Sequence, residues 1–257
     1  MGYVDSRTVA TNAKKKQPPR PGADRKARVE ALKKEQKAQE RRKTYIFVAV
    51  AVVIGGTLIA IPSLQILDKH KKDNRSFSQL GVPVGLASCD TVQTDKVGKD
   101  DGQHEPDPTV RINYATAPPD HGRHFQTPVT VNSRGYYTVD DTPRVEELVH
   151  NLEHGYTIVW YLPSVTGSQL DDLQAIAKKF RGSNDTRKFI VAPWDTSRGA
   201  FPTGKSIAIT HWGAPTKSGD YSTSTGYRQY CGQVSGDAIN TFVQGHPQTD
   251  APEPNTL

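Results

Sequence analysis

The chain has 257 residues, of which 35% are hydrophobic, and a net charge of +6 at pH 7. This composition indicates one ordinary domain with additional segments rather than a bundle of membrane helices. The first 43 residues hold 14 Lys and Arg against 5 Asp and Glu, whereas the other 214 hold 19 against 22. Because the excess of positive charge belongs to the tail, the folded part gives no indication of nucleic-acid binding.

The N-terminal part of the chain predicts a membrane anchor. Residues 1–43 form a basic tail whose beginning should be disordered and drawn to anionic lipids, and residues 24–43 could extend a membrane helix inward. Residues 44–67 contain no charged residue, and they are long enough to cross a hydrocarbon core of about 30 Å. Nine Lys and Arg precede this run within 20 residues and four follow it within 20. The positive-inside rule therefore places the N-terminus in the cytoplasm and the chain after Leu67 outside the plasma membrane.

The two cysteines, Cys89 and Cys231, both follow the predicted anchor. An exported domain lies in an oxidising compartment, so the sequence predicts one disulfide between them. The alternative is two unrelated buried thiols. The bond would close a long loop and, on the chain-entropy model, would stabilise the fold by about 5 kcal/mol.

After the anchor, residues 68–105 are polar and are interpreted as an extracytoplasmic linker and entry segment. Their histidines, His70 and His104, are interpreted as solvated surface groups. Residues 106–246 should form the globular domain, and residues 247–257 a flexible tail.

Local patterns predict strands and helices that interleave without a strict β-α repeat. We expect strands at 111–114, 127–131, 136–139, 156–162, 188–192 and 206–210. We expect one helix that starts at Val145 and two more at residues 168–180 and 235–243, the last capped by Ser235. The predicted fold class is α+β, a mixed sheet packed with helices.

The helix that starts near Val145 carries the densest group of chemically active residues. Its buried stripe follows helical spacing and comprises Val145, Leu148, Val149 and Leu152. His150 and His154 fall on the opposite face, one turn apart. Asp141 or Thr142 could cap its start, and Gly155 could end it in the left-handed conformation.

Two motifs resemble a known family. They are Pro118-Pro119-x-x-Gly122-x-His124 and Val149-His150-x-Leu152-Glu153-His154-Gly155, the second followed by a strand with Trp160-Tyr161. Over roughly residues 86–245 the chain resembles the bacterial domain of unknown function 3105 family. The resemblance matches His124, His150 and His154 to the family's recurring histidines, and it implies a membrane-tethered or exported domain. The family name confers no activity.

Metal binding is the first functional hypothesis. His150 and His154 would supply two ligands from one helix and His124 a third, with His121, His211 or water as the fourth. Imidazole ligands without thiolate suit Zn²⁺ or Cu²⁺.

Two alternatives remain open at the level of sequence. Residues 150–154 fit H-x-x-E-H, in which two histidines hold zinc and Glu153 would activate water in a hydrolase. The usual carboxylate ligand on a later helix is missing, because the only later glutamate, Glu253, lies in the tail. The other alternative is a structural or protein-interaction module at the cell envelope, in which the imidazoles bond to buried polar groups without a metal. The sequence names no protein partner.

Overall fold

The computed structural model describes residues 21–130, 134–182, 188–214 and 221–255 and divides into two compact units, Met1–Leu67 and Asp68–Leu257. Helix α1 (Pro21–Asp73) contains residues 24–43 and the predicted membrane span. In the described part of the chain, no helix combines the length and hydrophobicity that crossing a membrane requires. The side chains of residues 58–67, and the whole of residues 1–20, lie outside the described residues. The membrane span and the disordered tail therefore stay predictions.

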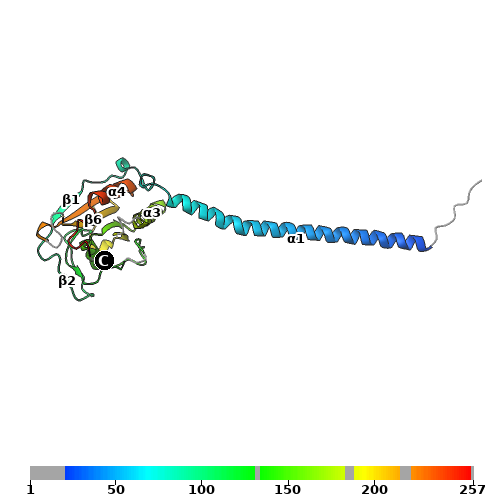
Figure 1. Ribbon diagram of the computed structural model, residues 1–257, viewed down its shortest axis with the longest axis horizontal. Coiled ribbons are helices and arrows are strands. Elements are labelled where there is room, and N and C mark those ends of the chain that lie inside the picture. Colours follow the sequence, from blue (N-terminus) through cyan, green and yellow to red (C-terminus); the bar gives the residue numbers. More distant parts are fainter. Residues whose placement is uncertain (1–20, 131–133, 183–187, 215–220, 256–257) are drawn as a thin grey trace, which may run out of the picture. The chain divides into compact units, whose positions relative to one another are not determined.

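The second unit, in which Figure 1 labels β1 and β6, is built on a five-stranded mixed sheet with the strand order β1-β7-β6-β4-β5. Strands β4 and β5 are parallel, and the other neighbouring pairs are antiparallel. The strands are β1 (Gln93–Lys96), β4 (Thr157–Tyr161), β5 (Phe189–Pro193), β6 (Ile207–Gly213) and β7 (Thr225–Cys231).

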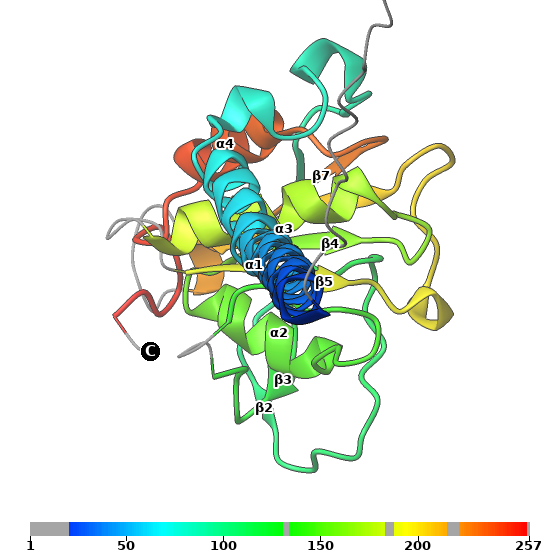
Figure 2. The ribbon, with the colours of Figure 1, turned by 90° about the vertical axis from the view of Figure 1, so that its right-hand side faces the viewer.

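Helices cover both faces of this sheet (Figure 2). One face packs against α3 (Ser168–Gly182) and α4 (Gly236–Gly245), whereas the other packs against α2 (Val145–Glu153). A two-stranded parallel sheet, β2 (His104–Glu105) and β3 (His124–Phe125), lies on the outer side of α2. Four short 3-10 helices occur in the described chain: η1 (Phe77–Gln79), η2 (Val84–Leu86), η3 (Thr196–Arg198) and η4 (Tyr221–Thr223). A mixed sheet packed with helices confirms the predicted α+β class.

Strand β4 shows why the central strands are apolar along their whole length. Val159 and Tyr161 enter the core beneath α3 and α4, while Ile158 and Trp160 enter the core beneath α2. A strand that is buried on both faces has no polar side to alternate with. The continuous run at residues 156–162 therefore marks the centre of the sheet.

Several predicted elements differ from the observed ones. Strands β1 and β7 were missed because their residues are largely polar and β7 alternates between buried and half-buried positions. Residues 111–114 form no strand, and the described parts of 127–131 and 136–139 form only one bridge, between Tyr136 and Val191. Residues 131–133, which include the rest of that predicted hairpin, lie outside the described residues. Helix α2 has Arg144 as its N-cap, not Asp141 or Thr142, since the Arg144 backbone N–H donates to the Glu147 carboxylate at 3.2 Å.

Two segments that lie outside the sheet are attached to the body of the second unit. The disulfide between Cys89 and Cys231, with an S–S distance of 2.01 Å, confirms the predicted pairing and ties the segment before β1 to the end of β7. In the C-terminal segment, predicted to be a flexible tail, Ala251 is fully buried. Gly155 has φ +89°, and a Cβ there would stand 2.3 Å from the Gln248 carbonyl oxygen. Glycine therefore lets the C-terminal segment approach the end of α2.

Candidate metal centre

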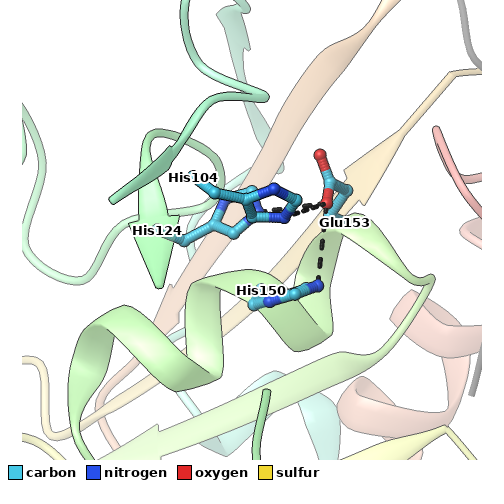
Figure 3. A group of neighbouring side chains, drawn as sticks. All are labelled: His104, His124, His150 and Glu153. Atoms are coloured by element: carbon cyan, nitrogen blue, oxygen red, sulfur yellow. Dashed lines mark ion pairs between the residues drawn. The ribbon is translucent and has the colours of Figure 1, made fainter. Parts of the chain in front are cut away.

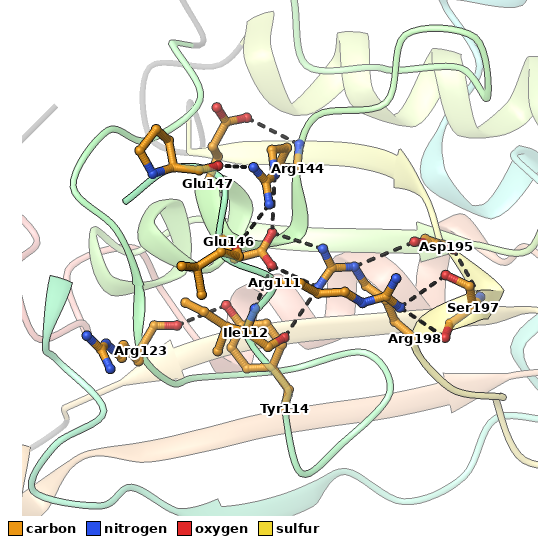
Figure 4. Close-up of polar contacts among 12 residues, drawn as sticks. Arg111, Ile112, Tyr114, Arg123, Arg144, Glu146, Glu147, Asp195, Ser197 and Arg198 are labelled. Carbon is orange, nitrogen blue, oxygen red and sulfur yellow. Dashed lines mark hydrogen bonds and ion pairs between the residues drawn. The ribbon is translucent and has the colours of Figure 1, made fainter. Parts of the chain in front are cut away.

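Glu146, in the first turn of α2, fixes the start of that helix (Figure 4). Its carboxylate is fully buried and accepts two contacts from the Arg198 guanidinium, at 2.9 and 3.1 Å. It also accepts a hydrogen bond from the Ile112 backbone N–H at 3.0 Å, and Arg144 lies 3.7 Å away. A paired and hydrogen-bonded carboxylate is tolerated in the interior. The network joins α2 to the chain before β3 and to the loop after β5.

Two polar side chains of α2 attach it to β3 and to the chain that follows β3. The Asn151 amide accepts from the Val129 backbone N–H at 2.9 Å and donates to the Val129 carbonyl at 3.1 Å. His150 Nδ1 lies 2.6 Å from the Phe125 carbonyl oxygen and donates to it. The carbonyl has no proton to give, so this bond places the proton of a neutral ring on Nδ1 and leaves Nε2 as a lone-pair donor.

Strands β2 and β3 bring two further histidines to α2. His104 and His124 are register partners in the parallel pair. Their rings lie 4.9 Å apart, and the His150 ring is 4.9 Å from His104 and 4.7 Å from His124. His124 is fully buried, whereas the His104 side chain is 43% exposed.

The three rings converge on the carboxylate of Glu153 (Figure 3). Glu153 Oε2 lies 3.0 Å from Nε2 of His124, 3.9 Å from that of His104 and 4.0 Å from that of His150. One ligand atom from each of the four residues lies within 4.8 Å of the others. Four ligands at 2.0–2.1 Å from a tetrahedral zinc ion stand roughly 3.3 Å apart. The contacts of Glu153 Oε2 with the three rings differ from this spacing by about 0.3 to 0.7 Å, and the ligand atoms lie up to 4.8 Å apart, so metal binding requires the side chains to move by up to about 1 Å.

His124 and Glu153 bring two buried polar atoms close together without a hydrogen bond between them. His124 Nδ1 donates to the Gly122 carbonyl at 2.8 Å, which leaves a lone pair on Nε2. Nε2 and Glu153 Oε2 are both buried, and within the described residues neither has a hydrogen-bond partner. With a neutral His124 ring, two lone-pair atoms at 3.0 Å repel each other unless a cation, either a proton or a metal ion, lies between them.

Burial and neighbouring groups set the charges of the centre. Burial, together with the nearby His124 and His154, lowers the pKa of His150 to about 3, so its ring is neutral at physiological pH. Burial raises the pKa of Glu153, but the attraction of a protonated His124 ring and a hydrogen bond donated by the Tyr221 hydroxyl to Oε1 lower it more. The net pKa of Glu153 lies below its usual range, and the residue is a carboxylate.

His154 faces a different set of residues. It forms a second group with Glu153 and Glu253, again with one ligand atom from each within 4.8 Å of the others. His154 Nδ1 donates to the Glu253 carbonyl at 3.2 Å and lies 3.7 Å from the Glu253 carboxylate. The three histidines that the sequence predicted as ligands of one ion are therefore divided. His124 and His150 share one group, and His154 belongs to the adjacent group with Glu153 and Glu253.

The other two predicted histidines have separate partners. His121 lies between carboxylates, at 2.5 Å from Asp120 and 3.3 Å from Asp101. Burial lowers the pKa of His121, but these acidic groups raise it more, so the net shift is upward and favours the charged ring. The buried His211 ring approaches the Asp250 carbonyl at 3.1 Å. In the part of the chain that the structure describes, neither histidine belongs to a ligand group.

The structure corrects two sequence interpretations. His104 is exposed, as expected, but it also belongs to the cluster, and the signal that places it there is its strand register with His124, which sequence spacing does not reveal. The face of α2 that carries His150 and His154 is also buried, with both residues 5% exposed. A second layer covers it, made of β2, β3 and the C-terminal segment.

The arrangement also bears on the H-x-x-E-H interpretation. That motif needs its two histidines on one zinc ion and its glutamate free to activate water. Here His150 and His154 fall in different groups, and Glu153 belongs to both. The geometry gives Glu153 the position of a ligand.

Comparison with known proteins identifies one family. The model of the family described as "Protein of unknown function (DUF3105)" matches residues 106–257. No curated protein and no solved structure gives a significant match to the chain.

Proposed function

The chain belongs to the DUF3105 family, whose description gives no activity, and we propose from its own residues that it binds a divalent transition-metal ion. The ligands are Nε2 of His104, His124 and His150 and one oxygen of Glu153. Three imidazoles, one carboxylate and no thiolate suit Zn²⁺ or Cu²⁺.

The observation that carries this proposal is the contact between His124 Nε2 and Glu153 Oε2. Both atoms are buried, and they lie 3.0 Å apart without a hydrogen bond among the described residues. Leaving a buried polar atom without a partner costs about 1–3 kcal/mol. A metal ion bound by both atoms removes that cost.

The surrounding hydrogen bonds support the same role. The Gly122 and Phe125 carbonyls accept from Nδ1 of His124 and His150, and the Tyr221 hydroxyl donates to Glu153 Oε1. Metal-bound histidines almost always donate their other ring N–H in this way. Four protein ligands fill a tetrahedral shell, which is typical of ions that are stored, carried or structural, whereas catalytic zinc keeps one position open.

A binding measurement tests the proposal. The full chain, produced without a histidine tag, is titrated with Zn²⁺ against a chromophoric chelator. We expect a tight Zn²⁺ equivalent that His104→Ala weakens at least tenfold, because one ligand is lost. His104 is part-exposed, so this variant should fold normally. The control is His246→Ala, which changes a histidine that packs on Tyr227, outside both groups. If His104→Ala and His246→Ala bind Zn²⁺ as the wild type does, these ligands are wrong.

We further propose that this domain is held at the outer face of the plasma membrane by a single N-terminal helix. The charge-free run at residues 44–67 and the excess of Lys and Arg before it support this orientation. The disulfide between Cys89 and Cys231 fits an oxidising compartment. A reporter enzyme that is active only outside the cell, fused after Leu257, should be active. Protection of residues 68–257 from protease in intact cells stripped of their wall would contradict this location.

A further inference from the structure

A second group of ligand atoms lies next to the proposed metal centre and shares Glu153 with it. It contains His154 from the end of α2 and Glu253 from the C-terminal segment. We propose that Glu153, His154 and Glu253 bind a second divalent ion, so that the Glu153 carboxylate bridges two metals. This inference rests on the proposed function, because the first ion fixes the position of the bridge.

The C-terminal segment is held where this site needs it. The Glu253 backbone N–H donates to the Glu153 carbonyl at 3.0 Å. The Lys188 ammonium donates to the carbonyls of His154 and Pro254, both at 2.8 Å, and so links α2 to the segment. Gly155 leaves the space through which the segment passes. Glu253 is therefore positioned by backbone contacts on both of its sides.

The shared carboxylate has the capacity to bridge. A carboxylate offers about four lone-pair positions. The Tyr221 hydroxyl takes one on Oε1, while Oε2 faces the histidines of the first centre. Oε2 is buried and has no hydrogen-bond partner within the described residues, so it is available to metal ions. The rings of His150 and His154 lie 4.6 Å apart, which makes the two positions adjacent.

The two positions differ in chemistry and in access. The first has three imidazoles and one carboxylate, and the second has one imidazole and two carboxylates. More oxygen ligands favour harder ions, such as Mn²⁺, at the second position. Each position also has one part-exposed ligand, His104 at 43% and Glu253 at 41% side-chain exposure, whereas Glu153 between them is buried. An ion can thus reach the pair from either group.

Electron paramagnetic resonance with Cu²⁺ tests the bridge on the full chain without a tag. Metal ions in two-metal sites lie roughly 3.5–4 Å apart, and carboxylate-bridged Cu²⁺ ions at that distance couple magnetically. We expect the wild type to bind two equivalents, with the signal per bound ion falling as the second enters. Glu253→Gln should bind one equivalent with full signal intensity. Asp100→Asn, a carboxylate-to-amide change at an exposed residue outside both groups, should behave as the wild type does.

Three results would overturn the bridge. In the first, wild type and Glu253→Gln both bind a single equivalent, which removes the second site and leaves the first centre intact. In the second, two equivalents bind but the signal stays proportional to the bound copper, which shows that the ions are separate. In the third, no Cu²⁺ binds tightly at all, which removes the proposed function together with the inference.

Discussion

Glu153→Gln should have opposite effects on stability with and without metal. In metal-free protein the Glu153 carboxylate lies 3.0 Å from Nε2 of His124, both atoms are buried, and with a neutral ring that nitrogen carries a lone pair. A glutamine places an amide of almost the same shape there, and its NH₂ can donate to Nε2. The substitution therefore replaces a repulsive contact by a hydrogen bond, but it also removes the anionic metal ligand.

The expected magnitudes follow from the burial of this pair. Satisfying a buried acceptor recovers about 1–3 kcal/mol, so the variant should be more stable than the wild type by that amount in chelator. Bound metal stabilises the wild type by about 4 kcal/mol when free Zn²⁺ is 1,000 times the dissociation constant. The variant, with a weaker ligand, should gain much less. Glu153→Gln should therefore be the more stable protein in chelator, and the wild type should be the more stable protein in excess Zn²⁺.

Urea unfolding in chelator and in excess Zn²⁺ measures both effects. Glu147→Gln is the matched control, because it makes the same change on the same helix outside the ligand group, and its amide oxygen can still accept from the Arg144 backbone. This control should follow the wild type in both conditions. If a shared proton holds His124 and Glu153 together instead, Glu153→Gln breaks a buried ion pair and is less stable in chelator. That outcome would refute the lone-pair argument.

Three further results are expected. Replacing Cys89 and Cys231 together by Ser should lower the stability by about 5 kcal/mol, because a loop with a sequence separation of 142 residues is no longer closed; an unchanged melting temperature would contradict this. Burial lowers the pKa of His211 to about 4 from 6.5, so the unfolded chain takes up its proton first as the pH falls. Protonation of His211 should therefore leave the free energy of unfolding unchanged above pH 6.5 and should lower it by about 3 kcal/mol by pH 4. Urea unfolding should show this loss in the wild type and not in His211→Gln. Tyr221→Phe, which removes the donor to Glu153 Oε1, should weaken Zn²⁺ binding about 10- to 100-fold with little change in metal-free stability; equal affinity would show that the hydroxyl does not orient the ligand.

Local patterns predicted the elements whose own residues face a core. The apolar stripe of α2 is buried as expected. Along α3 the same helical spacing buries Leu173, Ile176, Ala177 and Phe180, whereas Leu170 is half-buried. The Ser235 cap of α4 is confirmed, since its side chain accepts from the Ala238 backbone N–H. In each case the spacing of side chains along one segment carries the information.

The candidate site was only half predictable, because its other half depends on contacts between distant segments. His150 and His154 share one helix, so their spacing places them one turn apart. His104 reaches the centre only through its register with His124, and Glu253 reaches His154 only because the C-terminal segment packs on Gly155. Sequence gives no sign of either pairing. The same long-range contacts explain why His150 and His154 are buried although they lie opposite the apolar stripe of α2.

X-ray absorption spectroscopy of the Zn²⁺-loaded chain, with one equivalent bound, tests the central claim most directly. The account predicts four nitrogen or oxygen neighbours at about 2.0–2.1 Å, with scattering from three imidazole rings and no sulfur neighbour. His104→Ala should reduce the number of rings to two. A spectrum with fewer than three imidazoles in the wild type, or the same spectrum in wild type and His104→Ala, would contradict a centre formed by His104, His124, His150 and Glu153.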